Sequence, residues 1–195
     1  MTHEERIDSF VHEEMGRSEA GAHAYDHVKR VYSIAMRIGR KLHADLRVLG
    51  AAALLHDVGR FREEETGISH SRLSSDMGEG ILRELEYTDA EIQNVKEAIR
   101  THRFSENQTP TSLEGEILSD ADKLDAMGAI GVFRAVAQAA VENAGFDAFL
   151  KHADAKLLNL RDLMYTKAAR EMAEERHKVL QSFVKELRKE LQDES

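Results

Sequence analysis

The chain has 195 residues, of which 42% are apolar and 32% are charged, and it carries a formal net charge of −9. This length suits one domain with a hydrophobic core, and the negative charge argues against a nucleic-acid polymer or a membrane surface as the partner. The absence of cysteine excludes disulfides, thiolate nucleophiles and cysteine-ligated zinc, and together with an N-terminus that lacks an apolar signal segment it leads us to expect a cytoplasmic protein.

Apolar side chains recur at helical spacing in five segments of the first half of the chain. These segments are residues 4–15, 25–43, 46–56, 71–85 and 88–102. Asp45 can cap the third segment, and Thr88 with Glu91 forms a capping box before the fifth. The small residues at 16–24 and the acid-rich segment at 61–69 are expected to be loops.

The second half of the chain continues the helical pattern. Predicted helices cover residues 111–124, 126–142, 146–163 and 166–192. Thr111 with Glu114 forms a second capping box. Neither half shows the alternating pattern of a strand, and no Gly-rich or Ser-rich linker interrupts the chain. We therefore predict an all-α fold, a bundle of about eight to ten helices, in a single domain over residues 1–195.

The most apolar of these helices ends in His56 and Asp57, and Gly59 follows. Two interpretations fit this ending. The pair can be the hydrated C-terminal end of a helix that leaves the core, with Gly59 as its stop. Alternatively, both side chains can bind one metal ion, because a buried carboxylate needs a compensating cation or hydrogen bonds.

Other potential ligands lie far from this pair in the sequence. His27 falls on the apolar stripe of the second predicted helix, although a single inward histidine is more often a hydrogen-bonded core residue. Asp120 and Asp122 point to nearly opposite sides of a later helix, so only one of them can join the ligands. Asp125 shares a face with Asp122 and could orient a ligand. Two imidazoles and two carboxylates suit Mn²⁺, Mg²⁺, Fe²⁺, Co²⁺, Ni²⁺ or Zn²⁺, and the spacing does not choose among them.

Of the other histidines, five lie in polar or terminal contexts and are expected at the surface. They are His3, His12, His43, His152 and His177. His70 and His102 lie in the segments between the candidate ligands, which favours the metal interpretation.

The spacing His27…His56-Asp57…Asp122 resembles the H…HD…D signature of the HD superfamily of metal-dependent phosphohydrolases. The segments that carry the resemblance are residues 26–31, 52–59 and 121–124. The last of them favours Asp122 over Asp120 as the fourth ligand. The resemblance implies an all-helical HD domain with core motifs at about residues 20–190, in which His27, His56, Asp57 and Asp122 hold a divalent metal ion.

The resemblance extends to a bacterial and archaeal subfamily of single-domain HD hydrolases. Residues 101–105, 120–131 and 163–176 carry this part of it. Arg60 stands where some hydrolytic branches have an acid, and the Gly-Tyr-Pro motif of the cyclic-dinucleotide phosphodiesterases is missing. His70 and His102 match only part of the additional ligand set of dinuclear members, so a second metal is left open.

The implied activity is hydrolysis of a phosphate ester of a nucleotide, or of another small phosphorylated molecule, by a metal-activated water. Asp57 would help to hold the metal and its water. Arg60 and Lys123 would contact the phosphate, and His102 would donate a proton or make a second phosphate contact. Structural interpretations compete with these roles, because the two cations can form surface ion pairs and His102 can cap its own helix.

A second class of function stays open, namely a metal- and nucleotide-binding regulatory module without turnover. Iron-dependent redox chemistry needs more histidine ligands than the sequence places. A helical interaction domain without metal would leave His56 and Asp57 unexplained. An oligomer is also compatible with the sequence, because the apolar helix at 126–141 can be core or interface.

Overall fold

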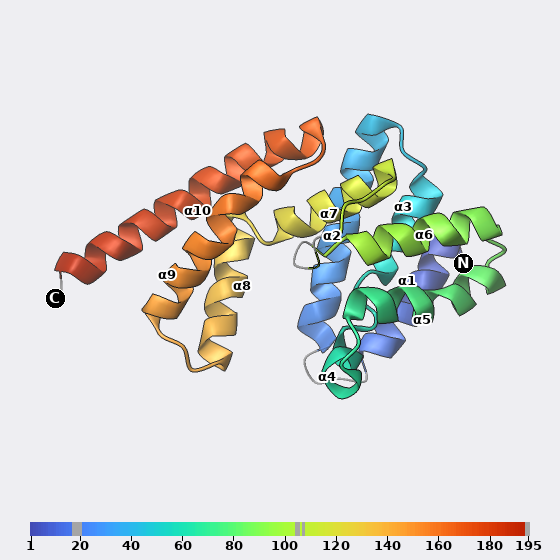
Figure 1. Ribbon diagram of the computed structural model, residues 1–195, viewed down its shortest axis with the longest axis horizontal. Helices are drawn as coiled ribbons and strands as arrows, with labels where there is room; N and C mark the ends of the chain where they lie inside the picture. Colours follow the sequence, from blue (N-terminus) through green and yellow to red (C-terminus); the bar gives the residue numbers. More distant parts are fainter. Residues whose placement is uncertain (17–20, 104–105, 107, 194–195) are drawn as a thin grey trace. The chain divides into compact units, whose positions relative to one another are not determined.

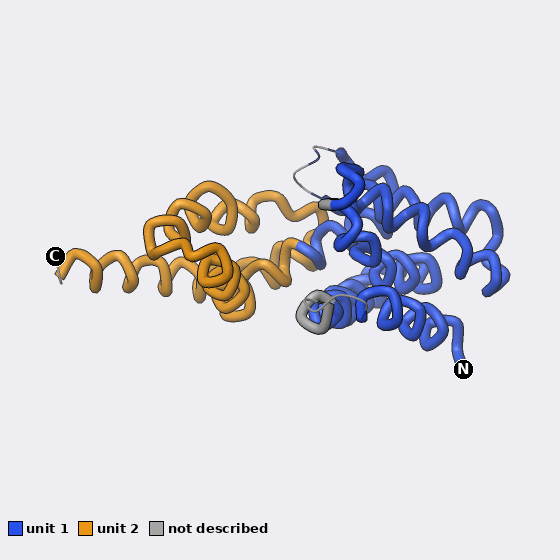
Figure 2. The backbone as a smooth tube through the Cα atoms, turned by 90° about the horizontal axis from the view of Figure 1, so that it is seen from below, with its two compact units in different colours: residues 1–122 blue, residues 123–195 orange. Residues whose placement is uncertain are grey.

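The computed structural model describes residues 1–16, 21–103, 106 and 108–193, and every regular element in these ranges is a helix (Figure 1). The predicted all-α fold is confirmed. The helices are α1 His3–Met15, α2 Gly21–Leu42, α3 Leu46–Leu55, α4 Glu63–Thr66, α5 His70–Glu84, α6 Asp89–Thr101, α7 Leu113–Asp125, α8 Gly128–Val141, α9 Phe146–Ala155 and α10 Lys167–Asp193, with 3₁₀ turns η1 Arg60–Arg62 and η3 Leu157–Leu163. The chain separates into two compact units, residues 1–122 and 123–195 (Figure 2). The single domain therefore stays a prediction.

The core of unit 1 is built on α3, which packs against α1, α2 and α6. Residues 48–55 are all buried, as their apolar side chains require. The predicted cap of this helix is confirmed, because Asp45 accepts hydrogen bonds from the backbone of Arg47 and Val48 at 3.0 and 3.2 Å. His56 and Asp57 leave the end of α3 with exposures of 0% and 2%. The interpretation of this pair as a hydrated helix end is therefore wrong.

The turn after Asp57 lies directly against α5. The Gly59 N–H donates to Ser74 Oγ at 2.9 Å. A Cβ added at Gly59 would lie 2.7 Å from Leu73 Cβ and 2.8 Å from the Ser74 backbone nitrogen. Glycine is needed here because any side chain would push the two backbones apart. This contact joins the turn that carries Asp57 to the helix that begins at His70.

We expect Gly59→Ala to lower the free energy of unfolding by about 2–3 kcal/mol, because its methyl group would meet the α5 backbone. Gly80→Ala, in α5, is the control for the same chemical change. Nothing lies within 4 Å of a Cβ added at Gly80, so this change should be neutral or stabilise by up to about 1 kcal/mol. Urea unfolding followed by circular dichroism measures both variants, and equal effects would contradict the close contact at Gly59.

Two predicted loops of unit 1 need correction. Residues 61–69 were expected to be a loop, but most of them form η1 and α4, and α4 ends at Gly67, whose φ is 66°. A run of acids was a poor guide here because short helical turns tolerate solvated carboxylates well. In the other predicted loop, residues 21–24 already belong to α2, whereas residues 17–20 lie outside the described part of the chain.

The two predicted capping boxes have different outcomes. The Thr88 box is confirmed, because Thr88 and Glu91 exchange hydrogen bonds at the start of α6. The second box is wrong, because Ser112 rather than Thr111 accepts the N–H of Gly115, at 3.1 Å. The Thr111 hydroxyl instead donates to Glu97 of α6 at 2.9 Å. The hydrogen bond to Glu97 of α6 therefore takes up the Thr111 hydroxyl that was expected to cap the following helix.

In unit 2, α10 packs against α8 and η3. The predicted helix at 146–163 is interrupted after Ala155, where α9 ends and η3 follows. Gly128 begins α8 with φ of 68°, and Arg176 of α10 donates to the carbonyl of Leu124 beside it. Phe133 on α8 is 75% exposed, so this apolar helix is not a core helix within the described structure. Across the described residues, no helix taken alone has the length and apolarity to cross a membrane, although α7 and α8 as a bent pair meet those two criteria.

Candidate metal centre

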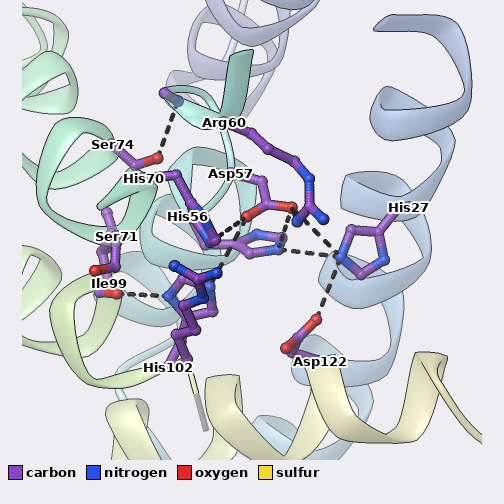
Figure 3. A network of polar contacts seen from close by, with 12 residues as sticks. His27, His56, Asp57, Arg60, His70, Ser71, Ser74, Ile99, His102 and Asp122 are labelled. Carbon is purple, nitrogen blue, oxygen red and sulfur yellow. Dashed lines mark hydrogen bonds and ion pairs between the residues drawn. The ribbon is translucent and has the colours of Figure 1, made fainter. Parts of the chain in front are cut away.

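Four side chains from distant parts of the sequence meet in unit 1 (Figure 3). They are His27 of α2, His56 and Asp57 at the end of α3, and Asp122 of α7. His27 Nε2 lies 3.4 Å from His56 Nε2 and 3.7 Å from Asp57 Oδ2. It also lies 3.3 Å from Asp122 Oδ1. The structure therefore brings together all four side chains that the sequence singled out as metal ligands.

The spacing of these atoms suits a small divalent cation. Two donors in neighbouring coordination positions lie roughly 3.0–3.4 Å apart when each is about 2.1 Å from the ion. The separations of His27 Nε2 from His56 Nε2 and Asp122 Oδ1 lie within this range, whereas Asp57 Oδ2 lies farther from His27 Nε2 and His56 Nε2, at 3.7 and 3.9 Å. His27, His56 and Asp57 form a group that could hold a metal ion. His27 is 5% exposed and Asp122 32%, so the group is buried on one side and accessible on the other.

The second oxygen of Asp57 faces two further imidazoles. Asp57 Oδ1 lies 3.2 Å from His70 Nε2 and 3.8 Å from His102 Nε2. This oxygen is buried and makes no hydrogen bond to any described residue. An unsatisfied buried carboxylate oxygen is costly, so it indicates a place for a cation or a proton. Asp57, His70 and His102 form a second group that could hold a metal ion, and Asp57 belongs to both groups.

Backbone carbonyls orient two of the imidazoles. His56 Nδ1 lies 2.8 Å from the carbonyl oxygen of Ala53, and His102 Nδ1 lies 2.6 Å from that of Ile99. A carbonyl oxygen can only accept a hydrogen bond, so each Nδ1 carries the proton. Each Nε2 therefore keeps the lone pair that a metal ligand requires, and it lies within 4 Å of an oxygen of Asp57, at 3.9 Å for His56 and 3.8 Å for His102.

The charge states of the cluster also suit a cation. Burial lowers the pKa of His56 to about 4 and also lowers the pKa of His102, so both are neutral at neutral pH. Burial alone would raise the pKa of Asp57, but the neighbouring histidines and Arg60 hold it well below its usual range. Burial also opposes ionisation of Asp122, and the histidines again lower its pKa. The two carboxylates are thus charged where the imidazoles of His56 and His102 are neutral.

The acids on either side of Asp122 occupy different surroundings. Asp120 is fully buried. Asp125 is also buried, and its Oδ2 accepts a hydrogen bond from Arg134 at 2.6 Å within unit 2. Of Asp120 and Asp122, the structure shows Asp122 facing His27, which agrees with the choice that the sequence motif favoured.

The remaining predicted site residues have clear positions. Arg60 donates from Nη1 to Asp57 Oδ2 at 3.0 Å, while its side chain is 51% exposed. His102 ends α6 and bonds the last turn of that helix, yet it also faces Asp57. Lys123 is 4% exposed, and its Nζ lies 4.6 Å from the centre of the Tyr165 ring in unit 2. The alternative for Arg60 and Lys123 was that each forms an ordinary ion pair at the surface. It does not fit either residue, because Arg60 contacts a buried carboxylate and Lys123 is itself buried.

Sequence reasoning did not assign a role to Glu63, although it lies next to this centre. Glu63 Oε2 accepts a hydrogen bond from His70 Nδ1 at 2.8 Å, which leaves His70 Nε2 directed at Asp57. Arg103 donates to the other oxygen of Glu63 at 2.7 Å. The acid run at 63–65 gave no hint of this contact, because only the fold brings Glu63 to His70.

Comparisons with known proteins agree with the motif. The HD domain family matches residues 24–127. The uncharacterized protein YpgQ of Bacillus subtilis is 35% identical over 181 residues, which cover 89% of this chain and 86% of YpgQ. A crystal structure of YpgQ in complex with ADP has a TM-score of 0.79 at 31% identity and covers 96% of this chain and 94% of its own. A predicted HD superfamily hydrolase from an uncultured Thermotogales bacterium has a TM-score of 0.73 at 31% identity, covering 95% and 91%.

Proposed function

Because this chain belongs to the HD domain family, we propose that it is a metal-dependent phosphohydrolase that acts on a nucleotide or another small phosphorylated molecule. The main support is that His27, His56 and Asp57 form a group that could hold a divalent cation, with Asp122 Oδ1 3.3 Å from the Nε2 atom of His27. The buried, unsatisfied Oδ1 of Asp57 adds weight, because it shows that the carboxylate lacks part of the positive charge or the hydrogen bonds that burial demands.

The protein's own residues would prepare the site for hydrolysis. His27, His56, Asp57 and Asp122 would hold the cation. When bound, a divalent cation would supply a water of lowered pKa and positive charge for the phosphoryl oxygens. Fixed Nδ1 hydrogen bonds keep His56 and His102 in the tautomer that presents Nε2 to the centre, so no reorganisation is needed when substrate arrives.

Three further residues are proposed to act on the substrate. Arg60 and Lys123 would contact the phosphate and offset the charge of its oxygens. For Arg60 the half-exposed guanidinium supports this role, because it can reach both solvent and the centre. His102 would donate a proton to the leaving group or make a second phosphate contact, and either role requires its Nε2, which lies beside Asp57, to take up a proton first, because the Nδ1 proton bonds the Ile99 carbonyl.

A nucleotide-like substrate is supported by the relative that was crystallised with ADP. That structure describes YpgQ, and it supports the substrate class proposed for this chain. The net charge of −9 makes a local cation important, because a nucleotide phosphate approaching an acidic protein needs positive charge at the site itself.

The test is hydrolysis by the full chain, first treated with a chelator and then supplied with Mn²⁺. A panel of nucleoside mono-, di- and triphosphates, p-nitrophenyl phosphate and bis-p-nitrophenyl phosphate covers monoesters, diesters and anhydrides. We expect no turnover after chelation and recovery of turnover with Mn²⁺ on at least one nucleotide. Tight nucleotide binding without turnover under any of these conditions would instead support a regulatory module.

A further inference from the structure

Arg60 donates a hydrogen bond to Oδ2 of Asp57, the oxygen that faces His27 and His56. Its Nη1 lies 3.0 Å from Asp57 Oδ2, and the same Oδ2 lies 3.7 Å from His27 Nε2 and 3.9 Å from His56 Nε2. Figure 3 draws the guanidinium beside this carboxylate. A cation held by these histidines and Asp57 would therefore have to bind an oxygen that already has a positively charged partner.

The distances make this a direct electrostatic conflict. A cation about 2.1 Å from Oδ2 would lie no more than about 5 Å from Arg60 Nη1, since that nitrogen is 3.0 Å from the same oxygen. Asp57 and Asp122 supply two negative charges, which a divalent cation alone would balance. With Arg60 in place the loaded centre would carry an excess positive charge, and like charges at this separation repel in a partly buried site.

Arg60 is also the group that stabilises Asp57 when no other cation is present. Asp57 is 2% exposed, and a buried carboxylate without a cationic partner is strongly unfavourable. The guanidinium itself is half exposed, and Asp57 is its ion-pair partner within the described residues. Its position on the short turn η1 leaves the long side chain free to swing into solvent at little cost in packing.

We propose that Arg60 is an internal competitor for the metal: it holds Asp57 Oδ2 in the metal-free protein, and a divalent cation has to displace it from that oxygen. This inference rests on the proposed metal site. It predicts that Arg60 weakens metal binding and so keeps the centre exchangeable. A residue that merely positioned Asp57 for the metal would have the opposite effect, because its removal would weaken metal binding.

The experiment is titration of the chelator-treated, full-length protein with Mn²⁺ by isothermal calorimetry. We expect Arg60→Gln to bind Mn²⁺ about 10-fold more tightly than the wild type, because the competing charge is gone. Arg60→Lys keeps the charge and should stay within about 3-fold of the wild type. Arg62→Gln is the matched control, because Arg62 also lies on η1 but pairs with Glu14 at 3.0 Å.

Equal or weaker Mn²⁺ binding by Arg60→Gln would overturn the competition, as would an equal gain in Arg62→Gln. Thermal unfolding by circular dichroism shows whether each metal-free variant is folded, and Arg60→Met, which also removes the charge, replaces Arg60→Gln if that variant is not. Tighter binding by Arg60→Lys of more than 3-fold would count against the charge argument. Absence of Mn²⁺ binding by every form, wild type included, would overturn the proposed function too, whereas binding with equal affinities would overturn only the role of Arg60.

Discussion

Asp57→Asn is expected to reduce Mn²⁺-dependent hydrolysis by about 1,000-fold or more. The reason is that Asp57 serves both sides of the centre, with Oδ2 towards His27 and Oδ1 towards His70 and His102. Asparagine keeps the size of the side chain but removes its negative charge and replaces one acceptor oxygen with a donor NH₂ group. The measurement is the initial rate on the best substrate of the panel at saturating Mn²⁺, with the Mn²⁺ affinity measured alongside.

The control for this prediction is Asp76→Asn. Asp76 is an exposed acid of α5 that pairs with Arg100 at 3.0 Å, and exposed pairs of this kind contribute little to stability. Its replacement should leave the rate unchanged. Thermal unfolding must show that Asp57→Asn is folded, because this change also leaves Arg60 without its partner. A folded Asp57→Asn protein with more than about a tenth of the wild-type rate would contradict the proposed centre.

Asp122→Asn is expected to weaken Mn²⁺ binding by about 100-fold or more, whereas Asp120→Asn should change it by no more than about 3-fold. Asp122 Oδ1 faces His27 at 3.3 Å and is the fourth proposed ligand. Asp120 is two residues earlier on the same helix and therefore points away from that face. The pair of variants tests one position against the other with identical chemistry. Isothermal calorimetry on the metal-free proteins gives both affinities.

Stability has to be followed separately in this pair, because Asp120 is fully buried. A buried carboxylate that is replaced by an amide can destabilise the fold without touching the metal. The comparison is therefore made at a temperature at which both variants are folded by circular dichroism. If Asp120→Asn lost Mn²⁺ affinity and Asp122→Asn kept it, the assignment of the fourth ligand would be wrong.

The sequence predicted the parts of the site that follow from a short motif and a clear helical pattern. The HD family resemblance is confirmed by the family match over residues 24–127. His27 could be placed on the inward face of its helix because apolar residues repeat around it. Asp45 could be identified as a cap because its chemistry acts within three residues. The roles of the site residues stay predictions until the binding and kinetic tests are made.

Contacts between distant segments could not be predicted in this way. Glu63 lies in an acidic run, and its hydrogen bond to His70 depends on the position of α4 against α5. Arg60 is different, because it pairs with Asp57 only three residues earlier. This spacing was a signal in the sequence for the ion pair, which the expected phosphate contact left out.

His177 shows a different kind of error. It was expected at the surface, as His3, His12, His43 and His152 are, but it is only 8% exposed. The neighbouring charged residues suggested a surface position. The evidence for burial was that His177 belongs to a buried stripe of α10. The other members of that stripe are Ala169, Ala173, Leu180 and Val184. Spacings of three and four residues along this helix would have identified the inward face.

The carbonyl groups that aim His56 and His102 have a consequence for genetic screens. Every amino acid has a carbonyl, so no codon change at Ala53 or Ile99 can delete the acceptor itself. Saturation mutagenesis would detect the loss of either imidazole, but it could not test the carbonyl oxygens that set their tautomers. Replacing single amides by esters through chemical synthesis, which weakens the carbonyl as an acceptor, is the kind of perturbation that would expose this hidden half of the centre.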